Sequence, residues 1–260
     1  MVSLRLVCAP DEADAISAEL WEAGTAGIRE LEEGDNVVLI AGFEEEIAGL
    51  AARLHRFQPQ WEREEDTDWT LATKLAWPGR VVGERIFLAP PWNEEPTPEG
   101  LVRVIHNPGL ASGTGEHPCT QLALEALEKS LFTGAVVADI GTGSGILAIS
   151  ALQLGAKFAV ALDTDEAALQ TARENFELNQ RHAYLATGSA DCIASDSIDI
   201  LVANISGSVL VAIADELIRV TKNDATLILT GFPEWELKAL QSVFGDGEVS
   251  SLIEWRCLSY

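Results

Sequence analysis

Residues 139–155, with the sequence DIGTGSGILAISALQLG, decide how this chain folds. An apolar run ends at Asp139, three glycines follow at alternate positions, and an apolar stretch with helical character begins at Ile146. Glycines at this place let the backbone turn tightly and approach a ligand closely, with the N-terminus of a helix directly behind them. The stretch therefore predicts a strand, a ligand-binding loop and a helix.

The same alternation continues on both sides of this unit. Short apolar runs predict strands at 135–139, 158–163, 198–203 and 226–230, and longer amphipathic stretches predict helices near 117–131, 144–154, 165–179 and 208–221. Strands that alternate with helices in this way form a parallel sheet covered by helices. We therefore expect an α/β fold with a Rossmann-like sheet.

The N-terminal part of the chain follows a different pattern. In residues 1–65 the hydrophobic period changes in the order strand, helix, strand, strand, helix, strand, which is typical of a ferredoxin-like α+β domain. Residues 66–80 contain two tryptophans and are predicted to form a linker that docks against a domain or contacts a partner. We expect the second domain at 81–260, beginning with β structure.

The formal net charge of −24 is the most unusual bulk property of the chain. Residues 1–100 alone hold 21 Asp and Glu against 8 Lys and Arg. Nucleic-acid-binding proteins usually present basic faces to the phosphates, so free DNA or RNA is not the expected substrate. The field of this chain would instead attract a basic protein partner, although acidic residues also simply keep proteins soluble.

Residue spacing and hydropathy exclude several other classes of protein. The four cysteines and four histidines are scattered without metal-ligand spacing, so we expect reduced thiols and no bound metal. No stretch approaches the ~18 uncharged residues of a membrane span, and the first residues do not have the pattern of a signal peptide. We therefore expect a cytoplasmic protein, with a monomer as the default state.

Two acidic residues near the glycine loop distinguish between cofactors. Asp163 ends the second predicted strand about 20 residues after the loop, where a carboxylate can accept hydrogen bonds from both ribose hydroxyls of a nucleoside. A dinucleotide fingerprint, G-x-G-x-x-G, would need glycine where Ile146 stands. Asp139 gives nothing to a pyrophosphate but can meet the ammonium of a methionine moiety, directly or through water. The pattern favours S-adenosylmethionine over NAD; the alternative is a tight turn that binds no ligand.

Two further residues could either act at a site or begin a helix. Asn204 follows the strand predicted at 198–203, and ligands bind at the carboxyl ends of strands in an open α/β sheet. Its amide can orient a neutral amine for in-line methyl transfer, which needs positioning more than a strong base. The alternative role for Asn204 is a helix N-cap. His117 lies in a glycine-rich loop at 108–118, where beginning a helix is commoner than catalysis.

At these residues the chain resembles the ribosomal protein L11 methyltransferases of the PrmA type. The resemblance spans nearly the whole chain. Its main motifs are the loop GLASGTGEHPCT at 109–120, residues 139–155, DTD at 163–165, REN at 173–175 with Asn179, and LVAN at 201–204. Upstream of these, DW at 68–69, VGER at 82–85 and APPW at 89–92 also match. It implies a class I methyltransferase with a seven-stranded sheet and a ferredoxin-like substrate-recognition domain. The implied reaction transfers methyl groups from S-adenosylmethionine to lysine side chains, and to the N-terminal amine, of a basic ribosomal protein.

The resemblance also implies roles for individual residues. It implies that Thr114 and His117 close over the cofactor, and that Gly141 and Gly143 contact its methionine part. It also implies that Asp163 binds the ribose, that Ser189 lies near the adenine, and that Asn204 positions the amine.

Three positions depart from the family pattern. Ser112 stands where the family has phenylalanine, which removes an apolar contact worth roughly 1–3 kcal/mol when buried. Cys119 replaces a threonine, and Gly207, after Ser206, is smaller than expected. These positions are expected near the methyl acceptor. The alternatives are therefore a related methyltransferase for another protein or a small amine, and a non-catalytic interaction protein that has kept the fold.

Overall fold

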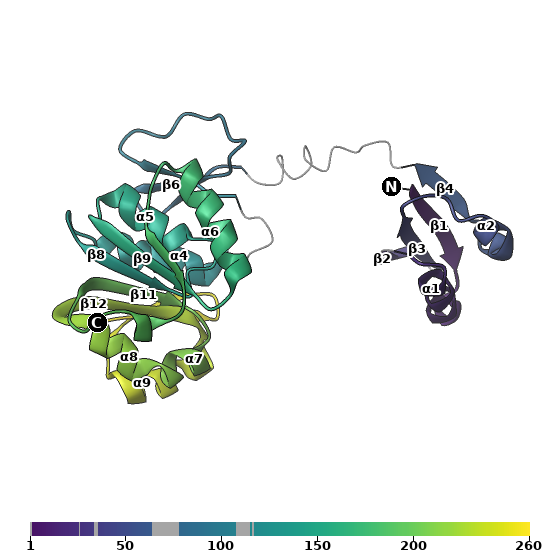
Figure 1. The fold of residues 1–260 in the computed structure, drawn as a ribbon. Helices are drawn as coiled ribbons and strands as arrows, with labels where there is room; N and C mark the ends of the chain where they lie inside the picture. The colour runs from purple at the N-terminus through teal and green to yellow at the C-terminus, as the bar shows by residue number, and fades with distance from the viewer. Residues whose placement is uncertain (1, 26, 34–35, 64–77, 108–114, 116) are drawn as a thin grey trace. The chain divides into compact units, whose positions relative to one another are not determined.

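Figure 1 shows the fold as a computed structural model, which describes residues 2–25, 27–33, 36–63, 78–107, 115 and 117–260. The chain forms two compact units, Met1–Thr73 and Lys74–Tyr260, and each is described by itself. The predicted linker, 66–80, lies outside the described residues except for 78–80, so its bounds and those of the flanking domains stay a prediction.

The N-terminal unit is an antiparallel sheet with two helices. Along the chain it consists of β1 (Val2–Cys8), α1 (Ala13–Glu22), β2 (Gly27–Glu33), β3 (Asn36–Phe43), α2 (Leu50–Arg53) and β4 (Gln60–Arg63). The strands lie in the order β2-β3-β1-β4, and every pairing is antiparallel. Alternate side chains of β1, Leu4 and Leu6, are fully buried with Leu20 of α1. The elements thus follow one another in the order that the hydrophobic periods indicate.

The C-terminal unit is built on a seven-stranded sheet. Its strands are β8 (Val136–Ile140), β9 (Phe158–Asp163), β10 (Tyr184–Thr187), β11 (Ile198–Asn204), β12 (Thr221–Pro233), β13 (Glu248–Leu252) and β14 (Trp255–Ser259). They lie in the order β10-β9-β8-β11-β12-β14-β13; the first five are parallel, and β14 runs antiparallel to both β12 and β13. The central strands are nearly continuous apolar runs because helices cover both faces of the sheet.

Helices from the two halves of this unit cover opposite faces of the sheet. The first group is α4 (Pro118–Ser130), α5 (Ile146–Leu154) and α6 (Glu166–Leu178), and the second is α7 (Gly207–Ala212), α8 (Ala214–Val220) and α9 (Leu237–Phe244). Each group packs into its own apolar cluster, with Leu124 and Ile149 in one and Leu217 and Leu240 in the other. A smaller sheet of β5 (Arg80–Val82), β6 (Ile86–Ala89) and β7 (Val102–Ile105) packs against α4 and α5. Short 3₁₀ turns occur at Pro10–Glu12, His55–Phe57, Ala190–Cys192 and Glu234–Glu236.

The Rossmann-like α/β fold predicted from the sequence is confirmed, with differences in detail. The single helix expected at 208–221 is two helices, α7 and α8, that meet at Ile213. The strands β10, β13 and β14 were not predicted, because they are short and their polar residues interrupt the apolar pattern. The helix α9 was also not predicted, although its apolar residues recur at helical spacing and were a usable signal. Among the described residues, no helix is long and apolar enough to cross a membrane.

Candidate active site

The main cavity of the C-terminal unit lies at the carboxyl ends of β8, β9 and β11 and has a volume of about 1030 Å³. β8 and β11 are neighbours in the sheet although β9 and β10 lie between them in the chain, so the strand order reverses here. Ligands of open α/β sheets bind at such a reversal. Gly141, Gly143, Asp163, Ser189 and Asn204, all expected at the site, line this single cavity.

The glycine loop forms one wall of the cavity through an unusual backbone. Gly141, Gly143 and Gly145 have φ values of +72°, +54° and +82°, a region that side chains disfavour. The loop is held to the neighbouring strand because the amides of Gly141 and Thr142 both donate to the carbonyl of Leu162, at 2.8 and 2.9 Å. A Cβ atom at Gly141 would also overlap the side chain of Ile205. Glycine is therefore required here by conformation and by space.

Asp139 lies beneath the loop and not in the cavity lining. Its side chain is fully buried, and Oδ2 accepts hydrogen bonds from the hydroxyl of Thr142 at 2.7 Å and the amide of Ala148 at 3.1 Å. Oδ1 has no hydrogen-bond partner among the described residues. Burial raises the pKa of Asp139 to about 6, although the two hydrogen bonds oppose the shift. The carboxyl group thus fixes the loop and the start of α5.

Asp163, at the end of β9, lines the cavity beside the glycine loop. Its Oδ2 accepts from the amide of Gly143 at 2.8 Å, and its Oδ1 accepts from the amide of Asp165 at 3.0 Å. Asp165 in turn caps α6 by accepting from the amide of Ala167 at 2.9 Å. Each oxygen of Asp163 keeps a second lone pair toward the cavity, which Ser189 also lines. A carboxylate held in this way can receive two hydroxyl groups without moving.

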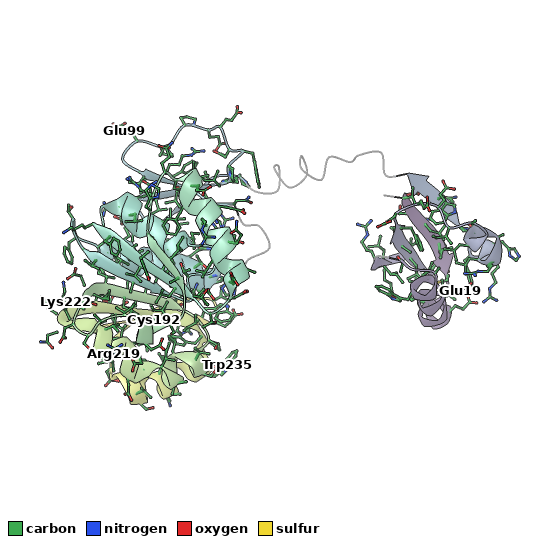
Figure 2. All side chains as sticks on the ribbon, viewed as in Figure 1. Glu19, Glu99, Cys192, Arg219, Lys222 and Trp235 are labelled. Atoms are coloured by element: carbon green, nitrogen blue, oxygen red, sulfur yellow. The ribbon has the colours of Figure 1, made fainter. Side chains whose placement is uncertain are left out.

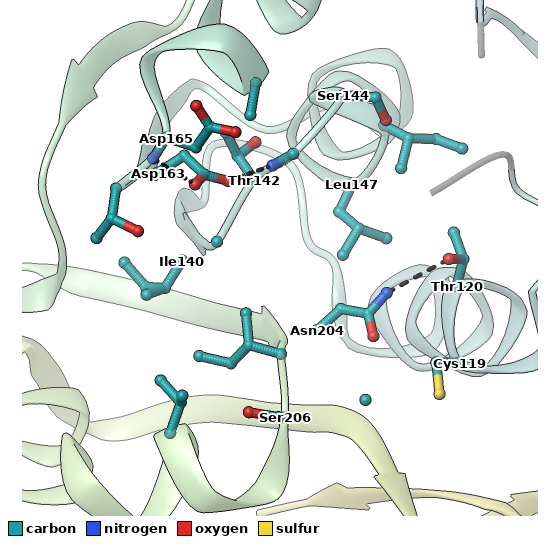
Figure 3. A pocket seen from close by; sticks show the side chains of 18 of the residues that line it. Cys119, Thr120, Ile140, Thr142, Ser144, Leu147, Asp163, Asp165, Asn204 and Ser206 are labelled. Carbon is teal, nitrogen blue, oxygen red and sulfur yellow. Dashed lines mark hydrogen bonds between the residues drawn. The ribbon is translucent and has the colours of Figure 1, made fainter. Parts of the chain in front are cut away.

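Asn204 ends β11 on the other side of the loop (Figure 3). Its Nδ2 donates to the hydroxyl oxygen of Thr120 on α4, at 3.3 Å, and Thr120 is almost fully buried. An amide nitrogen only donates, so Oδ1 is the atom of Asn204 that can accept a hydrogen bond in the cavity. The N-cap interpretation of Asn204 is wrong: α7 begins at Gly207, and its capping position is Ser206.

His117 stands at the mouth of the cavity and begins a helix, as its sequence position indicates. It is the N-cap of α4, and its Nδ1 accepts from the amide of Cys119 at 3.3 Å. The imidazole packs edge-on against the indole of Trp255 in β14, with ring centroids 4.7 Å apart. The two rings form an aromatic part of the cavity wall, and Asn204 lines the same cavity.

This arrangement agrees with what comparisons with known proteins find. The family model described as ribosomal protein L11 methyltransferase (PrmA) matches residues 31–259. A protein of that name from Parasynechococcus marenigrum (strain WH8102) is 39% identical over 197 residues, covering 73% of this chain and 68% of the relative. Another, from Shouchella clausii (strain KSM-K16), is 34% identical over 233 residues, covering 83% of this chain and 74% of the relative. The chain belongs to the ribosomal protein L11 methyltransferase family.

Solved structures support membership of the L11 methyltransferase family. A ribosomal protein L11 methylase from Lactobacillus delbrueckii subsp. bulgaricus has a TM-score of 0.65 and 27% identity, covering 70% of this chain and 97% of that one. A precorrin-6y C5,15-methyltransferase from Geobacter metallireducens shares the fold alone, with a TM-score of 0.50 and 19% identity over 60% of this chain and 95% of that one. The resemblance found from the sequence and the class I fold are confirmed, and S-adenosylmethionine is the cofactor of this L11 methyltransferase family member.

The residues present fit S-adenosylmethionine. The loop offers a wall without side chains at Gly141, the paired oxygens of Asp163 suit the ribose hydroxyls, and the unpartnered Oδ1 of Asp139 suits a nearby cation. Among the described residues, no group of three or more His, Cys, Asp or Glu side chains is arranged to hold a metal ion.

Thr114 and the three departures from the L11 methyltransferase pattern, Ser112, Cys119 and Gly207, differ in what the structure describes of them. Thr114 and Ser112 lie outside the described residues. Cys119, where the family has threonine, is buried and lines the cavity near Gly231. Burial raises the pKa of its thiol, which makes it an apolar wall and not a nucleophile. Gly207 is small because the carboxylate of Glu236 occupies the space that a Cβ would need.

Sequence reasoning missed two residues of the L11 methyltransferase site. Thr120 was part of a quoted motif but received no role, although a threonine one turn into a helix that follows a glycine-rich loop is a usable signal. Trp255 could not have been found, because it reaches the cavity only when β14 pairs with the end of β12, where Pro233 is its partner.

Proposed function

We propose that this protein transfers methyl groups from S-adenosylmethionine to lysine side chains, and to the N-terminal amine, of ribosomal protein L11. The names of its relatives motivate the choice of substrate. The observation that carries the chemistry is the tethered amide of Asn204, whose Nδ2 is bound to Thr120 while its Oδ1 stays available beside the glycine loop.

The site provides positioning more than acid or base. The bound cofactor supplies a methyl group on a positively charged sulfur. Oδ1 of Asn204 accepts a hydrogen bond from a neutral acceptor amine and directs its lone pair along the line of transfer, and the surplus amine proton leaves to solvent. Thr120 keeps the amide from rotating. The nitrogen–carbon bond forms as the carbon–sulfur bond breaks, so no covalent bond to the protein is needed.

We assign each part of the cofactor to residues that line a different part of the cavity. We assign the ribose to Asp163, the adenine end to Ser189, and the methionine end to Gly141 and Gly143. Asp139 is assigned to the ammonium of the methionine part indirectly, through the field of its carboxylate and through the loop that it holds, since its fully buried side chain outside the lining offers no surface to the ammonium or to a water molecule. His117, at the mouth, and Thr114, outside the described residues, are proposed to close over the cofactor.

The partner and setting belong to the same proposal. A net charge of −24 supports a basic protein substrate and argues against free nucleic acid. We propose that residues 1–65 serve substrate recognition, and that the protein acts as a monomer in the cytoplasm. A related acceptor, such as another protein or a small amine, is favoured by the departures at Ser112, Cys119 and Gly207, of which Ser112 lies outside the described residues.

Mass spectrometry of purified L11 after incubation with this protein and S-adenosylmethionine tests the proposal. We expect increments of about 14 Da per methyl group on lysines or the N-terminal amine, and the Asn204→Ala variant serves as the matched control. Unmodified L11, together with cofactor binding shown by calorimetry, would reject L11 as the acceptor and leave the methyltransferase itself standing.

A further inference from the structure

Two large apolar side chains stand out on the surface of the C-terminal unit. Among the described residues, Trp235 and Ile253 have the highest exposed fraction of the large hydrophobic side chains, 76% each. They lie on different segments, the 3₁₀ turn Glu234–Glu236 after β12 and the tight turn between β13 and β14. The two segments are neighbours, because the amide of Glu234 donates to the carbonyl of Glu254 at 2.8 Å. The two exposed side chains are therefore carried by adjacent turns.

These turns adjoin the active-site cavity. Trp255, which follows the turn that carries Ile253, lines the cavity and packs against His117. On the other side of Trp235, the Glu236 carboxylate lies against Gly207, next to the cavity-lining Ser206. Figure 2 shows Trp235 beside α7, at the edge of the unit. We call residues 234–236 and 253–254 the acceptor rim.

The acceptor rim is held in place by one arginine. The Arg256 side chain is only 13% exposed, and its guanidinium donates to the Glu234 carboxylate at 2.7 Å. The same guanidinium donates to the carbonyls of Ile253 at 3.0 Å and Trp255 at 2.7 Å. One largely buried guanidinium group thus forms hydrogen bonds with both turns of the acceptor rim.

Ile253 is in a conformation that folding alone does not favour. Its φ is +55°, in the left-handed region, which is a strong outlier for a β-branched residue and costs on the order of 1–3 kcal/mol. Glycine or asparagine would fit such a turn better. With 76% of its surface exposed, the side chain also gains little from burial in the fold. Neither the backbone conformation nor burial in the fold therefore accounts for an isoleucine at this position.

The charge of the acceptor rim defines the kind of partner. Three carboxylates lie there, those of Glu234, Glu236 and Glu254. Arg256 pairs with Glu234, and no ion pair of the other two occurs among the described residues. An exposed tryptophan and isoleucine between unpaired carboxylates suit a basic segment that also carries apolar residues.

We propose that the acceptor rim docks the lysine-bearing segment of the protein substrate. Apolar residues that flank the target lysine pack on Trp235 and Ile253, while Glu236 and Glu254 attract basic side chains toward the cavity mouth. The inference rests on the proposed function and names a surface for it that the cofactor does not use.

Steady-state kinetics with purified L11 test the rim through two full-length variants. Trp235→Ala should raise KM for L11 roughly 10-fold, because an exposed tryptophan at an interface is commonly a dominant contact. Ile253→Gly should raise KM several-fold while the melting temperature stays equal or increases, since glycine relieves the left-handed strain. For both variants we expect native kcat and native cofactor Kd. If Ile253 served only the stability of the fold, the Ile253→Gly variant would have a lower melting temperature than the native protein.

Matched controls lie elsewhere on the same unit. Ile218→Ala removes another half-exposed apolar side chain, on α8, and should keep the native KM. Glu236→Gln should raise KM about 2- to 5-fold, as removal of one complementary interface charge does, whereas Glu248→Gln on β13 should not. Native KM values for Trp235→Ala and Ile253→Gly, with L11 methylated normally, would overturn the rim and leave the proposed function intact. A native protein that does not methylate L11 would overturn both.

Discussion

At the scale of single residues, Asp163 and Asn204 are already hydrogen-bonded to the protein before any ligand is considered. Asp163 accepts two backbone amides, and Asn204 donates to Thr120. Groups held in this way lose little freedom when they bind a ligand, so removing one is costly for affinity or rate. Because the two residues contact different parts of the cavity, their substitution should separate cofactor binding from methyl transfer.

Asp163→Ala should weaken cofactor binding by about two to four orders of magnitude, since two charge-assisted hydrogen bonds of roughly 1.5–3 kcal/mol each are lost. Isothermal titration calorimetry with S-adenosylmethionine measures this directly. Glu166→Ala, which removes an exposed carboxylate at the start of α6, is the control and should bind normally. An unchanged Kd for Asp163→Ala would remove the ribose from this residue.

Thr120→Val should slow methyl transfer roughly 3- to 10-fold, because the loss of one hydrogen bond of about 0.5–1.5 kcal/mol frees the amide of Asn204 to rotate. Asn204→Ala should be slower still. Thr120→Ser keeps the hydroxyl and should retain most of the rate. Single-turnover rates at saturating cofactor give the comparison, and cofactor Kd should stay native in all three; equal rates for valine and serine would show that the tether has no catalytic effect.

At the scale of elements, the strand and helix pattern around the glycine loop could be read from the sequence, but the acceptor side could not. β8, β9 and β11 are long apolar runs, and the glycine loop has a distinctive spacing. β13 and β14 alternate weakly and reach the site only through antiparallel pairing with β12, which no local pattern reveals. Residues that line the cavity around the glycine loop could therefore be named from the sequence, whereas Trp255 and the hydrogen bond of Asn204 to Thr120 could not.

The end of β11 depends on a glycine in its neighbour β12. Gly231 has a φ of +95°, and a Cβ there would overlap the backbone carbonyl of Ile205. Gly245, which ends α9, has a similar φ of +92° but no atom within 4 Å of an added Cβ. Gly231→Ala should therefore destabilise the protein by about 1–3 kcal/mol and reduce activity by shifting Asn204. Gly245→Ala carries the conformational strain alone, so equal losses of melting temperature and activity in both variants would contradict the contact.

At the scale of the whole molecule, the net charge of −24 bears on how the protein would meet the basic substrate proposed above. Their association would be steered by attraction, which salt screens. KM for L11 should rise several-fold between low and about 0.3 M salt, while Kd for S-adenosylmethionine changes little. Kinetics in a sodium chloride series test this, with potassium glutamate as a second salt. A flat KM would show that the acidic surface serves solubility alone.

The buried carboxyl group of Asp139 can hold one proton in the folded protein at mildly acidic pH. Its pKa of about 6 lies above the ordinary value of 3.8, so the folded protein binds this proton more tightly than the unfolded chain does. The resulting stabilisation is complete below about pH 4 and is lost as pH rises through 6, by about 3 kcal/mol for a shift of two units. Thermal unfolding of the native protein and of Asp139→Asn should therefore differ most in pH dependence between pH 4 and 6.

The arrival of a cation near the unpartnered Oδ1 of Asp139 would favour the charged carboxylate and expel that proton. At pH 6 the heat of S-adenosylmethionine binding should then depend on the ionisation enthalpy of the buffer, and at pH 8 it should not. A heat that is independent of the buffer at both pH values would place the positive end of the cofactor away from this carboxyl group. The residue that shapes the glycine loop would thus also link cofactor occupancy to the acidity of the surroundings.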